Sequence, residues 1–192
     1  DSGINYFDIA PGYGNAEEKL GPALQRYRND VFLACKTGKR DAAGAQEELE
    51  RSLQRMRTDH FDLYQLHGMT TDEDFAEATG PGGALETFVR AREEGKVRYL
   101  GFSAHSAECA LALLDHFDFD SVLFPINWAH FLNGGFGPQV VEKAEEKGAA
   151  VLALKAMAYG KVAPEAERPF AKCWYQPIEE PELQDLALRY SL

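Results

Sequence analysis

The sequence predicts an α/β fold in which parallel strands alternate with outer helices along 192 residues. Short apolar segments alternate six times with segments of helical period, and Gly95 and Gly148 follow charged segments as helix C-caps do. Six βα units suit an open doubly wound sheet, or a (β/α)8 TIM-barrel type fold that lacks two units. No long linker interrupts them, so we expect a single domain over residues 1–192.

The strand candidates are short and rich in Val, Leu, Phe and Tyr. Continuous apolar strands are typically buried on both faces, as in a parallel sheet. The predicted strands are 5–10, 31–36, 61–66, 97–103, 121–126 and 149–154.

The segments between the strands carry apolar residues three and four positions apart, the period of an amphipathic helix. The first predicted helix is 16–27, and the pattern recurs near 49–56, 85–89, 110–117, 140–144 and 183–190. Segment 70–83, TTDEDFAEATGPGG, is predicted as the only long irregular connection, and NGGFG at 133–137 as a turn.

Composition and charge restrict the partners. The formal net charge of −11 argues against broad contact with nucleic acid or anionic membranes. No apolar segment approaches the roughly 18 residues of a membrane helix, and no signal peptide is visible. Cys35, Cys109 and Cys173 are odd in number and far apart, which favours free thiols and a cytoplasmic location. The oligomeric state is left open.

Polar residues recur where the predicted strands end. They are Asp8, Lys36, His67, Ser103, Asn127 and Lys155. Any one of them alone is explained by a strand that emerges into solvent. Together they suggest the catalytic face of a parallel barrel, which lies at the carboxyl ends of its strands. The glycine fingerprints of doubly wound nucleotide binders and of P-loops are missing.

The residue types suit carbonyl reduction. Asp8 can neutralise Lys36, and a cation beside Tyr13 is expected to lower the phenol pKa from about 10, which favours proton donation. A neutral His67 can hydrogen-bond the same substrate oxygen. The hydride would come from a cofactor.

Four motifs in order carry a family resemblance: NYFDIAPGYGNAEEKLG, ACKTG, DLYQLHG and GKVRYLGFSAHS. Together they resemble the aldo-keto reductases. The resemblance implies a (β/α)8 barrel, a small carbonyl substrate, and NADPH bound without a Rossmann motif, with NADH not excluded. It also implies that Asp8, Tyr13, Lys36 and His67 are catalytic, with Tyr13 as the proton donor.

Cofactor contacts are implied for Asp8 and Ser103. Ala104 stands where the family often has the Asn that follows this Ser. Leu123 stands where many members have Gln, and Asn127 is expected to carry part of that role.

The nicotinamide pocket also differs after the last predicted strand. Lys155 and Met157 stand near the position of the family's stacking aromatic, which makes Lys155 a candidate cofactor contact. The resemblance further implies that the family's first strand and eighth-strand region are missing. We therefore expect residues 1–192 to be a segment of a longer protein, or to associate through their edges, and to bind NADPH weakly.

Other residues have weaker assignments. His105 and Trp128 are candidate substrate contacts beside His67, although packing explains Trp128 equally well. The histidines lack H-E-x-x-H or H-x-H spacing, so no metal site is predicted. Cys35 should pack on the opposite side of its strand from Lys36. Segment 173–183 is a possible lid over the cofactor.

Two other functions stay open at this point. A Schiff-base aldolase-type barrel could use Lys155 or Lys36. An NADPH-binding sensor subunit with little turnover is also compatible with the altered nicotinamide contacts.

Overall fold

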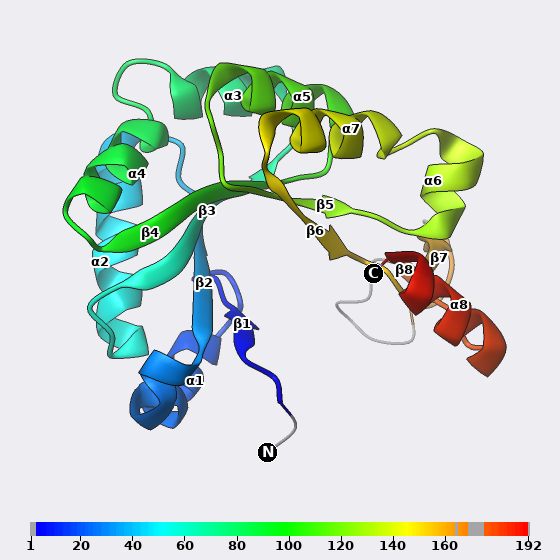
Figure 1. Ribbon diagram of the computed structural model, residues 1–192, viewed down its shortest axis with the longest axis horizontal. Coiled ribbons are helices and arrows are strands. Elements are labelled where there is room, and N and C mark those ends of the chain that lie inside the picture. Colours follow the sequence, from blue (N-terminus) through cyan, green and yellow to red (C-terminus); the bar gives the residue numbers. More distant parts are fainter. Residues whose placement is uncertain (1–2, 164, 169–174, 192) are drawn as a thin grey trace.

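The computed structural model describes residues 3–163, 165–168 and 175–191. Its main sheet has six parallel strands that pair in chain order and curl into an open half-barrel (Figure 1). They are β1 (Tyr6–Asp8), β2 (Phe32–Thr37), β3 (Phe61–Met69), β4 (Val97–Ala104), β5 (Ser121–Pro125) and β6 (Ala150–Leu154). The predicted fold, a (β/α)8 type with six of eight units, is confirmed.

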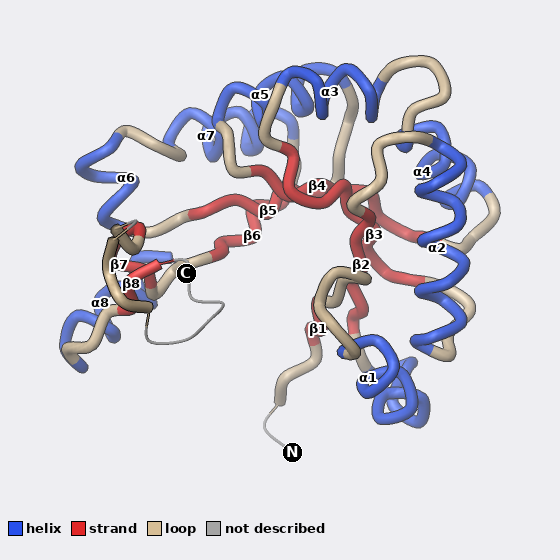
Figure 2. Tube along the Cα trace, turned by 180° about the vertical axis from the view of Figure 1, so that it is seen from behind, coloured by secondary structure: helices blue, strands red, loops and turns tan. Residues whose placement is uncertain are grey.

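Most of the helices cover the convex face of the sheet and leave its concave face open, while the last helix lies beyond the end of the sheet (Figure 2). The helices are α1 (Ala16–Leu24), η1 (Gln25–Asp30), α2 (Ala42–Met56), α3 (Asp72–Thr79), α4 (Ala84–Glu93), α5 (Ala107–His116), α6 (Trp128–Gly134), α7 (Pro138–Lys147) and α8 (Pro181–Ser191). Gly95 and Gly148 have φ of 73° and 72°, as expected of glycines that follow helices. None of these helices is long and apolar enough to cross a membrane, within the residues described.

The prediction of an irregular connection over 70–83 was wrong, because this segment contains α3. Thr71 accepts a hydrogen bond from the Asp74 N–H at 3.0 Å, and the Asp74 carboxylate accepts one from the Thr71 N–H at 3.1 Å. This reciprocal pair is a capping box. The TTDED motif carries its signal, and the shortness of the apolar pattern after it concealed the helix.

The C-terminal part has a small antiparallel hairpin that the sequence did not predict. It pairs β7 (Ala158–Lys161) with β8 (Tyr175–Pro177). Cys173 and the start of the proposed lid, segment 173–183, lie outside the described residues.

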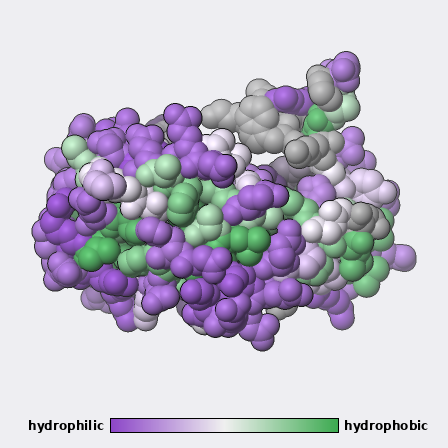
Figure 3. Space-filling model, turned by 90° about the horizontal axis from the view of Figure 1, so that it is seen from above, coloured by the Kyte–Doolittle hydropathy of each residue, from purple (hydrophilic) through white to green (hydrophobic). Residues whose placement is uncertain are grey.

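The main core lies between the sheet and the helices. Leu33, Tyr64, Leu66, Phe102 and Phe124 are each at most 1% exposed there. Viewed from the side of α3, α5 and α7, hydrophilic residues surround a band of hydrophobic ones (Figure 3).

The concave face of the sheet also carries aromatic residues, toward the start of its strands. The ring of Phe32 lies 5.2 Å from that of Tyr6 and 6.2 Å from that of Tyr99, centroid to centroid. Tyr6 and Tyr99 remain 38% and 39% exposed. The apolar and polar ends of this face are therefore separated along the strands.

Candidate active site

The parallel register brings the predicted polar strand ends to one edge of the sheet. Asp8 is opposite Ala34 on β2, and Lys36 is opposite Gln65 on β3. His67 and Ser103 occupy the last parts of β3 and β4. The prediction that these side chains share one end of the sheet is confirmed.

Asp8 and Lys36 form the ion pair that the sequence predicts. The side chain of Lys36 is 1% exposed and that of Asp8 is 25% exposed. Burial lowers the pKa of Lys36 to about 8, and the Asp8 carboxylate opposes this by favouring the charged ammonium.

Tyr13 lies on the loop between β1 and α1, with its ring between Lys36 and His67. The ring centroids of Tyr13 and His67 are 5.7 Å apart and nearly perpendicular, at 89°. The Lys36 ammonium is 5.2 Å from the centroid of the Tyr13 ring. No hydrogen bond joins the Tyr13 hydroxyl to Lys36 or His67 in the part of the chain described. Tyr13 therefore contacts both residues through its ring.

The predicted lowering of the Tyr13 pKa was wrong. Burial, followed by the influence of Cys35, raises the pKa of Tyr13 above its usual 10. The Lys36 ammonium, 5.2 Å from the ring centroid, does not offset this effect. Tyr13 is consequently protonated at neutral pH.

His67 is neutral at pH 7. Burial lowers its pKa to about 4, and the cations Lys36 and Arg40 and the imidazole of His105 add to the effect. The peptide group after His67 is fixed by Ser103, whose Oγ accepts a hydrogen bond from the Gly68 N–H at 2.8 Å. A neutral imidazole can donate one ring N–H to an oxygen of a ligand.

The three other predicted cofactor contacts, Ser103, Asn127 and Lys155, differ in burial and in hydrogen-bond partners. Ser103 is 2% exposed, and its Oγ still has a proton to donate. Asn127 caps α6, because its Oδ1 accepts a hydrogen bond from the His130 N–H at 3.0 Å. The Lys155 ammonium lies 3.5 Å from Nδ1 of His105. The roles of Ser103, Asn127 and Lys155 as cofactor contacts stay predictions.

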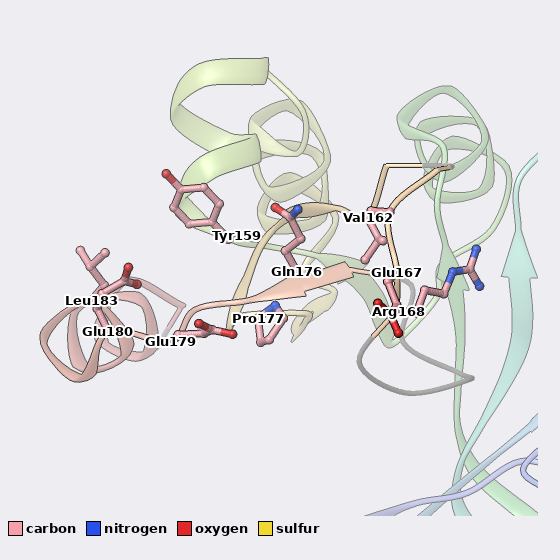
Figure 4. A pocket seen from close by; sticks show the side chains of 10 residues that line it. Tyr159, Val162, Glu167, Arg168, Gln176, Pro177, Glu179, Glu180 and Leu183 are labelled. Carbon is pink, nitrogen blue, oxygen red and sulfur yellow. The ribbon is translucent and has the colours of Figure 1, made fainter.

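Two cavities lie toward the C-terminal part of the chain. One of about 410 Å³ is lined by residues that include His105, His130 and Lys155. Another, of about 650 Å³, lies between the β7–β8 hairpin and α8 (Figure 4). None of Asp8, Tyr13, Lys36 and His67 (the tetrad) is among the residues that line the larger one.

Trp128 is not brought to the tetrad. Its ring packs edge-on against Tyr159, with centroids 5.7 Å apart. It is also absent from the residues that line the 410 Å³ cavity beside His105. The packing interpretation of Trp128 is therefore favoured over a substrate contact.

Sequence reasoning missed Gln65, which lies beneath the tetrad. Its Nε2 is 3.5 Å from Oδ2 of Asp8, and its buried Oε1 has no hydrogen-bond partner in the described residues. Its position two residues before His67 places it on the same strand face, and that spacing was an available signal.

The described residues were also compared with what a metal site or a reactive thiol would require. The described residues contain no group of three or more His, Cys, Asp or Glu that could hold a metal ion. Cys35 is fully buried in the core, as predicted, and burial raises its pKa to about 12.

Comparisons with known sequences point to one protein family. The sequence profile of the aldo/keto reductase family matches residues 1–185. The protein "Uncharacterized oxidoreductase YqkF" of Bacillus subtilis is 38% identical over 116 residues, covering 53% of this chain and 36% of that protein. An aldo-keto reductase of Strobilurus tenacellus is 29% identical, covering 88% of this chain and 51% of its own length. The chain thus spans about half or less of the length of these relatives.

Solved structures agree with this assignment. The holo form of an aldo-keto reductase from Bacillus halodurans superimposes with a TM-score of 0.71 at 26% identity, covering 98% of this chain and 68% of that one. An aldo-keto reductase from Klebsiella pneumoniae in complex with NADPH gives a TM-score of 0.67 at 26% identity, covering 81% and 54%. Because the family profile spans nearly all of the sequence and the folds agree, this chain belongs to the aldo/keto reductase family.

Proposed function

We propose that the chain carries the active site of an NADPH-dependent oxidoreductase that reduces an aldehyde or ketone to an alcohol, with Tyr13 as the proton donor. One observation carries the proposal: a protonated phenol, a neutral imidazole and a buried ion pair meet at the carboxyl end of the sheet. The family, and the NADPH in the Klebsiella pneumoniae relative, support it.

Local chemistry fits a nicotinamide cofactor beside the tetrad. The Ser103 hydroxyl accepts from the Gly68 N–H, which leaves its own proton for an amide oxygen. Asp8, with a quarter of its side chain exposed, can accept from a ribose hydroxyl. When bound, NADPH would supply the hydride.

The proposed roles of the tetrad follow from protonation states. The carbonyl oxygen of the substrate would lie between Tyr13 and His67, where the neutral imidazole donates a hydrogen bond. Tyr13 would transfer its proton to that oxygen as the carbonyl carbon gains the hydride, so that one hydride and one proton convert C=O to CH–OH. The Lys36 ammonium stabilises the phenolate that remains. Tyr13 is 46% exposed, so water can restore its proton.

The charge of the active-site end favours a small carbonyl compound over a polymer. His67 is neutral and Asp8 compensates Lys36, so the tetrad offers a polar but nearly uncharged site. The formal net charge of −11 does not favour nucleic acid as a substrate.

A pair of tyrosine variants tests the proposal. Tyr13→Phe removes the phenolic proton, and Tyr27→Phe makes the same change at a tyrosine of similar exposure, 43% against 46%, in η1. NADPH oxidation with 4-nitrobenzaldehyde should fall by about two orders of magnitude or more in Tyr13→Phe and stay unchanged in Tyr27→Phe. Fluorescence titration should give the same NADPH affinity for both variants.

Other outcomes would point elsewhere. Wild-type turnover in Tyr13→Phe would remove Tyr13 as the acid. Firm NADPH binding by the wild type without turnover of any aldehyde would favour a sensor. Trapping of a carbonyl substrate by borohydride on Lys36 or Lys155 would favour Schiff-base chemistry.

A further inference from the structure

The peptide group between His67 and Gly68 is held on both sides. On one side, the Gly68 N–H donates to Ser103 Oγ at 2.8 Å. On the other, the His67 carbonyl accepts a hydrogen bond from Arg40 Nη2 at 3.0 Å, and the Gly68 carbonyl accepts from the same nitrogen at 3.4 Å. Gly68 has φ of 69°, a left-handed conformation that other residues rarely adopt. The backbone of His67 is therefore fixed by side chains from outside its own strand.

Arg40 is itself fixed. Its Nε donates to Asp74 Oδ1 at 2.8 Å, and its side chain is 13% exposed. The Asp74 carboxylate also caps α3 by accepting hydrogen bonds from the Thr70 and Thr71 N–H groups. The Arg40 carbonyl accepts a hydrogen bond from the Ala84 N–H, at the start of α4, at 2.6 Å. The guanidinium thus ties α3 to the end of β3, and the backbone carbonyl of Arg40 adds a bond to the start of α4.

From this arrangement we propose that Arg40 is a positioning residue, which holds the His67 backbone so that the imidazole faces the substrate oxygen. Arg40 acts through His67 and contacts neither substrate nor cofactor. The inference rests on the proposed function, because it assigns Arg40 a part in the same reaction. The planar guanidinium suits the task, because it can bond a carboxylate and carbonyl oxygens at the same time.

The influence of Arg40 on His67 can be measured through the pKa of the imidazole, which depends on the charges around it. Lys36, Arg40 and His105 lower the pKa of His67 after burial, and Glu48 opposes them. Tyr13, protonated at neutral pH, packs against the imidazole edge-on. Removing the Arg40 guanidinium takes away one of the nearby cations and one support of the backbone, so the pKa of His67 should rise.

A second arginine provides a matched control at the opposite end of the same two strands. Arg28 is 14% exposed and pairs with Asp62 at 2.9 Å. Its Nη1 and Nη2 donate to the carbonyls of Val31 and His60, the residues that precede β2 and β3. Arg28 and Arg40 therefore resemble each other in burial and in partner types, and differ in their distance along the strands from the tetrad.

The experiment compares Arg40→Met with Arg28→Met in the 192-residue chain or in a longer chain that contains it. Three quantities are measured: the pKa of His67 by NMR titration of the imidazole, the kcat and KM for NADPH-dependent reduction of 4-nitrobenzaldehyde, and urea unfolding. In Arg40→Met we expect the His67 pKa to rise by about one unit and kcat to fall by about 10- to 100-fold, with little change in NADPH binding. In Arg28→Met we expect lower stability and an unchanged His67 pKa.

Arg40→Lys separates charge from geometry and covers the case in which the Met variant does not fold. A lysine keeps the cation but cannot bond Asp74 and both carbonyls together, so kcat should still fall while the His67 pKa stays closer to that of the wild type. The same pKa and kcat in Arg40→Met, Arg28→Met and wild type would overturn the proposal and leave Arg40 a purely structural residue. If the wild type reduces no aldehyde, the proposed function fails, and the His67 pKa still decides whether Arg40 acts on His67.

Discussion

Lys36 and Asp8, on neighbouring parallel strands, form an ion pair in which the lysine is almost completely buried. A buried ammonium requires a counter-charge, because its transfer from water is costly. Removal of the carboxylate should therefore affect both the stability of the fold and the proposed chemistry, and the two effects can be measured separately.

Asp8→Asn should destabilise the fold. The change leaves the Lys36 ammonium buried without its carboxylate, and we expect a loss of about 3 kcal/mol in the free energy of unfolding measured in urea. Asp185→Asn is the control, since the Asp185–Arg189 pair on α8 is 59% and 74% exposed and should contribute less than about 1 kcal/mol. Equal small losses in the two variants would show that Lys36 does not depend on Asp8.

The lowered pKa of His67 predicts that the stability of the fold depends on pH. Its pKa is about 4 in the fold against 6.5 ordinarily, so between these values the unfolded state binds more protons. The free energy of unfolding should therefore fall as the pH drops from 6.5 to 4, and the contribution of His67 should be constant above that range. Urea unfolding of His67→Gln across pH 4 to 7 should show a shallower slope than wild type, by up to about 1.4 kcal/mol per pH unit. Identical slopes would mean that His67 titrates normally.

Gly21→Ala should destabilise the protein, although alanine is the better helix former by about 1 kcal/mol. Gly21 is buried where α1 meets the end of α2, and an added Cβ would lie 2.3 Å from the Arg55 carbonyl oxygen and 2.8 Å from Met56 Cα. Both are backbone atoms, so relief requires the helices to separate. Thermal unfolding should show a lower Tm, and a raised Tm would mean that the two helices adjust freely.

Cys35 and Cys109 should resist alkylation in the folded protein. Burial raises the pKa of Cys35 to about 12 and that of Cys109 to about 11, so neither is a thiolate at neutral pH. Iodoacetamide followed by peptide mass spectrometry should label both only after denaturation. Rapid labelling of Cys35 in the native state would indicate that α2 opens away from β2.

Particular elements show how far the sequence predicted the fold. The strand at 31–36 was predicted within one residue of β2 at each end, and the strand at 61–66 begins with β3 but ends three residues before it. Both were found because β2 and β3 are largely buried and largely apolar. The helix α3 was missed, because its stability comes from the capping box and from Arg40 more than from an apolar face. The first helix was predicted to reach residue 27, but after Leu24 the chain continues as the 3₁₀ helix η1.

For the site, the sequence by itself determined the chemical groups and the end of the sheet where they gather. Asp8, Lys36 and His67 end apolar strands, and parallel strands must bring such ends to one edge. Only the tertiary structure decided their protonation, because it is set by burial and by neighbours distant in sequence. Burial, followed by the influence of Cys35, reversed the expected pKa shift of Tyr13. Arg40 reaches the His67 carbonyl across 27 residues of sequence, a contact that no local pattern records because the pairing of β2 with β3 creates it.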